Sequence, residues 1–226
     1  DDNGNLVVKT DARSVSTHYE YDSINRVTRR WYNGSNSTSN TTHNVPALPS
    51  GVGATDEVKF YYDSQTLPGG APSYSRGAGI GRLVAQTYGT GSNGDYYAYD
   101  VLGRPNLKIQ QTGAVNYQMS AGYTLSGAVS SLTYPSGRSI SNTFDQAGRL
   151  TTFSGNLGGT SRTYSTGSVY SSLGGLLKEQ FGTDTSVYHK LHYNSRAQLC
   201  DVRASNVNNE WGGELGAITN YYSTPF

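Results

Sequence analysis

One short pattern recurs along the chain and limits what the chain can fold into. In its fullest copy, "YYAYDVLGRPNL", alternating tyrosines lead to Tyr99 and Asp100, and then to Gly103 and Arg104. Aligned copies, some of them weaker, place an aromatic residue before the turn at steps of 21 to 26 residues, at Tyr99, Tyr123, Phe144, Tyr170 and Tyr193. A repeat of this length is typical of proteins built from stacked supersecondary units.

Each copy has the chemistry of a β-hairpin. Aromatic residues at alternate positions, such as Tyr97 and Tyr99, indicate a strand before the turn. Asp100 suits the first position of a type I turn and Gly103 suits the left-handed position after it, which predicts a three-residue hairpin loop with a bulge. Asp100 and Arg104 then flank the loop, where an exposed ion pair contributes about 1 kcal/mol or less.

Variation at the glycine position sharpens this interpretation. Asn25 replaces Gly in "DSINR", and Asn tolerates a positive φ better than most residues. Ala197 in "NSRAQ" would bring a β-carbon into the left-handed region at a cost of roughly 1 kcal/mol or more, so this last hairpin is predicted to turn differently. The predicted turn signature comprises Tyr21, Asp22, Asn25 and Arg26, then Tyr99, Asp100, Gly103 and Arg104, then Phe144, Asp145, Gly148 and Arg149.

The copies extend over nearly the whole chain. We therefore expect residues 1–226 to form a single all-β domain of repeated antiparallel hairpins, with loop insertions at 32–56 and 64–80. Pro105 cannot donate a backbone hydrogen bond, so it should lie at the edge or the start of a strand. The chain begins within the pattern, at "DDNGN". We therefore expect it to be a segment of a longer polypeptide.

Composition argues against several classes of partner. The formal net charge is +1 and 15% of residues are charged, which gives no electrostatic reason to expect nucleic acid or an anionic membrane. No run approaches 18 apolar residues, so no membrane span is expected. Cys200 is the single cysteine, which excludes an intrachain disulfide and a cysteine metal cluster.

No catalytic, cofactor-binding or metal-binding site is predicted. His189 and His192 are three residues apart, and on a strand they would face opposite sides of the sheet. The paired glycines lack the strand–loop–helix context that phosphate binding requires, and turns explain them better. No nucleophile or carboxylate pair lies in a mechanistic context, so we expect no enzyme.

One polar segment, "NGSNSTSNTTHN", contains three N-glycosylation sequons, at Asn33, Asn36 and Asn40. Two interpretations stay open: an unmodified polar loop between strands, or a surface loop that carries sugar. The mass of the intact protein against the sequence mass of 24.3 kDa distinguishes them.

The repeated residues resemble the YD repeats of the Rhs family, whose pattern is close to Tyr-x-Tyr-Asp-x-x-Gly-Arg-Leu. Residues 19–27, 97–105 and 144–150 match best. The resemblance implies a long ribbon of hairpins that spirals into a hollow shell or superhelix, in secreted or cell-surface proteins such as bacterial Rhs proteins, insecticidal toxin-complex proteins and teneurins. The family's Asp-Pro self-cleavage motif is not found in these 226 residues, so no residue inherits an autoprotease role.

Three functions remain compatible with the sequence. The leading hypothesis is a non-enzymatic extracellular scaffold whose uncapped terminal strands recruit other copies, or adjacent segments of a longer chain, into a fibre or surface appendage. A second is a slice of an Rhs-type toxin-encapsulating shell. A third is a surface-adhesion or glycan-binding module that uses exposed Tyr, Trp31 or Trp211, although strand packing already explains the alternating tyrosines.

Overall fold

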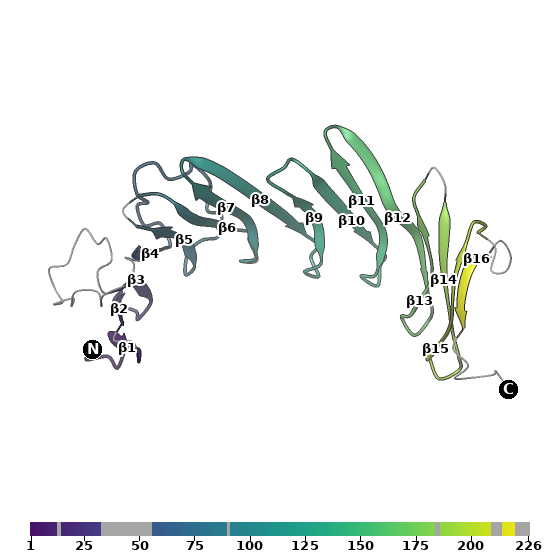
Figure 1. Cartoon of the computed structure of the whole chain (residues 1–226), viewed down its shortest axis with the longest axis horizontal. Coiled ribbons are helices and arrows are strands. Elements are labelled where there is room, and N and C mark those ends of the chain that lie inside the picture. The colour runs from purple at the N-terminus through teal and green to yellow at the C-terminus, as the bar shows by residue number, and fades with distance from the viewer. Residues whose placement is uncertain (13–14, 33–55, 90, 184–185, 209–213, 220–226) are drawn as a thin grey trace. The chain divides into compact units, whose positions relative to one another are not determined.

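A computed structural model describes residues 1–12, 15–32, 56–89, 91–183, 186–208 and 214–219 (Figure 1). The described residues form sixteen strands and no helix, which confirms the all-β prediction. The strand order in the sheet is the order in the chain, and paired strands are antiparallel. By its internal contacts the chain divides into two compact units, residues 1–120 and 121–226.

The first unit contains the shorter strands and the long insertion. Its strands are β1 (Val8–Thr10), β2 (Ser16–Tyr21), β3 (Val27–Tyr32), β4 (Val58–Tyr62), β5 (Leu83–Tyr88), β6 (Gly94–Tyr99), β7 (Pro105–Thr112) and β8 (Val115–Tyr123), the last of which ends in the second unit. β7 begins at Pro105, where the missing N–H does no harm to the ladder.

The second unit continues the hairpins with longer strands. These are β9 (Val129–Thr133), β10 (Ser139–Phe144), β11 (Leu150–Leu157), β12 (Thr160–Tyr170), β13 (Leu176–Phe181), β14 (Val187–Tyr193), β15 (Leu199–Ser205) and β16 (Glu214–Thr219). Several hairpins shift register by one residue close to the turn, as between His192 and Tyr193. This is the bulge that the sequence predicted for such loops.

The hydrophobic core lies in the first unit, on one face of β5–β7. Ala85, Tyr96 and Ile109 face one another across these three strands and are almost completely buried. Side chains of the 64–80 insertion pack on this cluster through Leu67, Ala71 and Tyr74. The insertion has no regular strand, and it covers the sheet.

Specific contacts hold the insertion in place. The Tyr74 hydroxyl donates to the Val84 carbonyl at 2.6 Å, and the Tyr74 ring meets Tyr96 edge to face with centroids 6.0 Å apart. Gly77 forms an isolated parallel bridge with Tyr99. A β-carbon at Gly77 would lie 2.0 Å from the Tyr99 carbonyl oxygen, so only glycine permits this close approach.

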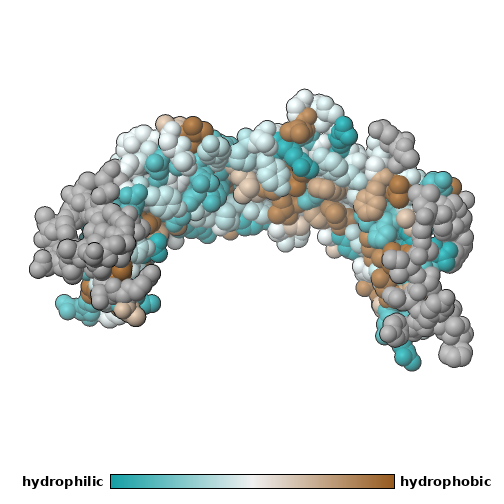
Figure 2. Space-filling view, in the orientation of Figure 1, coloured by the Kyte–Doolittle hydropathy of each residue, from teal (hydrophilic) through white to brown (hydrophobic). Residues whose placement is uncertain are grey.

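The described part of the second unit has no comparable cover. None of its described apolar side chains is buried, whereas the polar residues Ser165, Lys190, Asp201 and Ser205 are. Two pairs of its aromatic rings pack while only partly buried, Phe153 with Tyr164 at 5.1 Å between centroids and Phe181 with His189 at 6.0 Å. Figure 2 accordingly shows brown, apolar patches at the surface of this unit.

Candidate functional site

The candidate site is the junction between consecutive hairpins, and it begins with the turn. In the copy at Asp100, the Asp100 N–H donates to the Arg104 carbonyl at 2.9 Å, and the Gly103 N–H donates back to the Asp100 carbonyl at 2.8 Å. Gly103 has φ of 78°, in the left-handed region. The same backbone bonds recur at Asp22 and Asp145, where Asn25 and Gly148 take φ of 65° and 77°.

The Asp side chain closes each of these turns. One carboxylate oxygen of Asp100 accepts from the N–H groups of Leu102 and Arg104, both at 2.9 Å, and the other accepts from the Arg104 guanidinium at 2.7 Å. The Arg104 N–H, followed by the guanidinium, holds the pKa of Asp100 below its ordinary value. Arg149 lowers the pKa of Asp145 in the same way. The Asp–Arg pair is therefore part of the turn and not free for chemistry.

The last hairpin does not turn differently, so the prediction for Ala197 was wrong. Ala197 takes φ of 60°, and its N–H donates to the Asn194 carbonyl at 2.9 Å, as in the glycine copies. The Asn194 side chain accepts from the N–H groups of Arg196 and Gln198, both at 2.9 Å, and donates to the Gln198 side chain. These hydrogen bonds outweigh the strain of roughly 1 kcal/mol at the β-carbon.

Degenerate copies keep the same backbone turn with other residues at the Asp position. Thr124 and Ser171 each accept a hydrogen bond from an N–H four residues ahead through the side-chain hydroxyl. Tyr134 keeps only the backbone bonds. The turn is thus fixed by backbone geometry, and the acceptor side chain at its first position reinforces it.

One further in-phase turn lies at the start of the chain and was not predicted from the sequence. Gly4 takes φ of 80°, and its N–H donates to the Asp1 carbonyl at 3.0 Å. Asn5 donates its N–H and its side-chain amide to the two oxygens of Asp1. The signal was the spacing Asp-x-x-Gly-Asn, in which Asn5 stands where the other copies have Arg.

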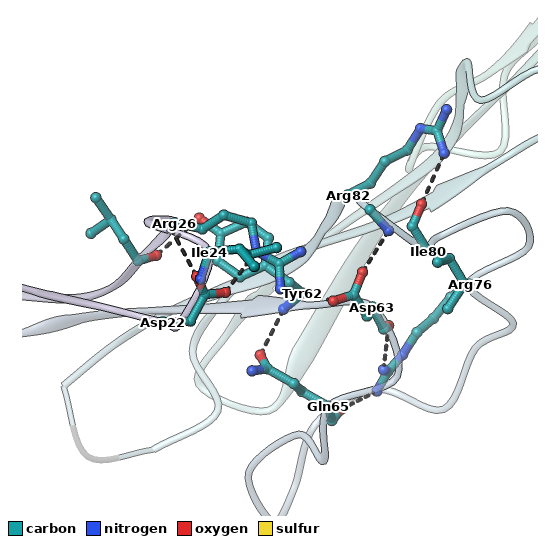
Figure 3. A network of polar contacts seen from close by, with 11 residues as sticks. Asp22, Ile24, Arg26, Tyr62, Asp63, Gln65, Arg76, Ile80 and Arg82 are labelled. Carbon is teal, nitrogen blue, oxygen red and sulfur yellow. Dashed lines mark hydrogen bonds and ion pairs between the residues drawn. The ribbon is translucent and has the colours of Figure 1, made fainter. Parts of the chain in front are cut away.

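Four junctions among the described residues are made by the tyrosine that precedes the turn residue. The Tyr62 hydroxyl donates to the Val27 carbonyl at 2.9 Å, and Val27 directly follows the Arg of the preceding turn. That residue, Arg26, holds its guanidinium 4.3 Å from the Tyr62 ring centroid and also bonds Asp63 at 2.8 Å (Figure 3). One repeat therefore contacts the next at three groups: the ring and the hydroxyl of Tyr62 and the carboxylate of Asp63.

The same connection recurs in both units. Three further tyrosine hydroxyls donate to the carbonyl one residue past the preceding turn, Tyr21 to Leu6 at 2.8 Å, Tyr99 to Leu83 at 2.6 Å and Tyr170 to Leu150 at 2.6 Å. Arg82 and Arg149 lie over the rings of Tyr99 and Tyr170 at 5.6 and 4.8 Å. Burial raises the pKa of Tyr99, which keeps its hydroxyl protonated as a donor.

The insertion in the second hairpin preserves this junction. The Asp63 N–H donates to the Arg82 carbonyl at 3.1 Å, so the two residues still flank the turn although residues 64–81 separate them. The Asp63 carboxylate accepts from the Gly81 N–H and from Arg26, and the Arg26 guanidinium is the leading cause that lowers its pKa. Arg76 ties the insertion to the Asp63 and Gln65 carbonyls (Figure 3).

Other residues singled out in the sequence have structural surroundings. His189 lies 3.1 Å from Glu179 and stacks on Phe181, and within the described residues no three His, Cys, Asp or Glu gather as a metal site. Among the described residues no helix is long and apolar enough to cross a membrane. The Cys200 thiol donates to the His192 carbonyl.

The adhesion hypothesis loses one of its two tryptophans. Trp31 is 3% exposed, with the Arg29 guanidinium 4.6 Å from its centroid and His18 stacked at 5.2 Å. An indole held this way is not an accessible platform for a ligand. Trp211 and the sequons at Asn33, Asn36 and Asn40 lie outside the described residues.

The RHS repeat family matches residues 1–30, which contain the turns at Asp1 and Asp22 and the first tyrosine junction. The chain carries an RHS repeat. Later hairpins of the chain repeat the geometry of this RHS segment, so the resemblance seen in the sequence is confirmed. No curated protein matches the chain.

Solved structures share the fold of this chain. The Photorhabdus luminescens Tc holotoxin pore is similar with a TM-score of 0.65 and 14% identity over 97% of this chain. The crystal structure of TcdB2-TccC3 is similar with a TM-score of 0.61 and 15% identity over 91% of this chain. This chain covers 10% of each of those chains, so it spans about a tenth of their length.

Proposed function

We propose that this chain is a non-enzymatic section of the wall of an Rhs-type toxin-encapsulating shell, outside the cell or at its surface. The observation that carries the proposal is the recurring junction, in which the turn arginines Arg26, Arg82 and Arg149, each with the carbonyl after it, hold the tyrosine of a following hairpin. Such a junction connects one hairpin firmly to the next, and its arginine, tyrosine and carboxylate are all engaged in these contacts. The fold shared with Tc proteins supports the same function.

A wall must also resist unwanted pairing at its edges. In the described sheet, every strand between β1 and β16 is hydrogen-bonded to a neighbour on each side. The outer edges of β1 and β16 are then the places where adjacent repeat segments join. In the shell proposal these segments belong to the same longer polypeptide, whereas in the fibre hypothesis they belong to other copies.

Electron microscopy with static light scattering separates these assemblies. We expect the 226-residue chain to give no filaments at any concentration, and the product of the complete reading frame to form closed hollow particles. Filaments that lengthen with protein concentration would contradict the shell and favour the fibre. Monomers of the complete product without an enclosed volume would contradict both.

Glycosylation of Asn33, Asn36 and Asn40 stays a proposal for a chain that passes through a secretory pathway. The expected mass without sugar is 24.3 kDa, and occupied sequons would raise it. Replacement of the three asparagines by glutamine should remove any added mass. An unmodified mass from the natural source would contradict the proposal.

A further inference from the structure

Two arginines of the second unit have no carboxylate partner among the residues that the structure describes. Residues 121–170 contain four charged side chains, Arg138, Asp145, Arg149 and Arg162. Asp145 already pairs with Arg149 at 2.7 Å inside its turn. The excess positive charge of this segment therefore belongs to Arg138 and Arg162, neither of which has an acidic partner within the described residues.

Arg138 is free of a carboxylate because its turn begins with tyrosine. Tyr134 and Arg138 make the same backbone bonds as the Asp–Arg copies, with the Tyr134 N–H donating to the Arg138 carbonyl at 2.8 Å. The Tyr134 side chain offers no carboxylate to the guanidinium. Arg138 instead lies 5.6 Å from the Tyr164 ring centroid, with one nitrogen 3.5 Å from the Tyr164 hydroxyl.

Arg162 reaches the same place from the neighbouring hairpin. It lies opposite Gly155 in the register of β11 and β12. A β-carbon at Gly155 would be 2.7 Å from the Tyr164 ring, so glycine lets the ring lie against the strand. Together these residues border a surface cavity of about 400 Å³, lined by Arg138, Leu157, Thr160, Arg162 and Tyr164.

We propose that Arg138 and Arg162 form a binding site for an oxyanion, a sulfate or phosphate group. Guanidinium groups present a planar fork of N–H donors that matches the oxygens of such groups, and no carboxylate of this segment competes for them. The Thr160 hydroxyl adds a further donor at the cavity wall. Leu157 and the Tyr164 ring supply apolar wall for the carrier of the group, as a sulfated saccharide would need.

NMR titration of the 226-residue chain tests this site with three probes: inorganic sulfate, inorganic phosphate and a heparin-derived hexasaccharide. We expect shifts centred on Arg138 and Arg162, and about a tenfold loss of affinity in each of Arg138→Gln and Arg162→Gln. Arg196→Gln is the matched control, because Arg196 is an exposed turn arginine outside the cavity. It should bind as the parent does.

The three probes also identify the source of the group. Equal binding of the inorganic ions and the hexasaccharide would assign a site for free anions, and binding of the hexasaccharide alone would assign a saccharide site. The absence of a localised shift with all three probes would overturn the proposal. An equal loss in Arg196→Gln would overturn it too, because general charge attraction would then explain the binding.

Discussion

The two units of the chain use the same hairpin but stabilise it differently. In the first, the 64–80 insertion covers β5–β7, and Tyr96 beneath it has no exposed surface. In the described part of the second, the turns and junctions recur without any fully buried apolar side chain. The comparison teaches that the turn and junction hydrogen bonds specify the ribbon, whereas the core is an addition made by one loop.

The largest expected difference is in the free energy of unfolding that is lost when a buried ring of the first unit or a partly exposed ring of the second is removed. Tyr96→Ala removes a fully buried ring and should lower the free energy of unfolding of the first unit by about 3–5 kcal/mol. Phe153→Ala in the second unit removes a partly exposed ring and should cost about half as much. Urea denaturation measures both. Equal losses would contradict the contrast between the units.

The junction itself should matter equally in both units. Tyr99→Phe and Tyr170→Phe each remove a hydroxyl that donates at 2.6 Å to a carbonyl of the preceding hairpin. Each substitution should lower the free energy of unfolding by about 1 kcal/mol, with the ring contacts kept. Tyr117→Phe, on an exposed ring, is the control and should be neutral. Unchanged stability in Tyr99→Phe and Tyr170→Phe would show that the junction hydrogen bonds do not stabilise the ribbon.

The strained turn offers a gain in stability. Ala197→Gly keeps φ of 60° but removes the β-carbon that strains it, so the free energy of unfolding should rise by up to about 1 kcal/mol. Gly148→Ala, the reverse change in an equivalent turn, should lower it by a similar amount. Denaturation midpoints of the pair check both signs. A loss in Ala197→Gly would show that the strain is not real.

The smallest expected effect is on the acid side of the pH profile. The pKa values of Asp100 and Asp145 are lowered in the folded state, chiefly by hydrogen bonds from the N–H groups of Arg104 and Arg149. Their contribution is complete above the unfolded value of about 4 and is lost as pH falls through the lower folded value. The unfolding temperature of an Asp100→Asn, Asp145→Asn variant should fall less steeply with falling pH than that of the parent protein. An equally steep fall would contradict this.

The hairpins could be predicted from sequence because their signals are local. Asp, Gly and Arg at fixed spacing report a turn, and alternating aromatics report a strand, as at Tyr97 to Arg104. The mistake at Ala197 came from weighing its β-carbon without the hydrogen bonds of Asn194. An intrinsic cost of about 1 kcal/mol is small enough for such neighbours to reverse.

The junctions and the core could not be predicted, because they join residues that only the fold brings together. Nothing local shows that the Tyr62 hydroxyl reaches Val27, or that Asp63 bonds Arg26. The insertion reads as a polar, Gly- and Pro-rich loop, and its Tyr74 contacts Tyr96 only once the loop folds back. Trp31 looked available for the same reason, since sequence spacing does not tell which face is covered.

Hydrogen exchange of the native chain, followed strand by strand, tests the central claim most directly. A ribbon fixed by its turns and junctions predicts protected amides in the hairpin strands of both units, with β5–β7 the slowest to exchange because the insertion buries them. The account would be contradicted if β5–β7 exchanged as fast as β10–β12. It would also be contradicted if β10–β12 showed no protection, because a core would then be necessary for the hairpins to form.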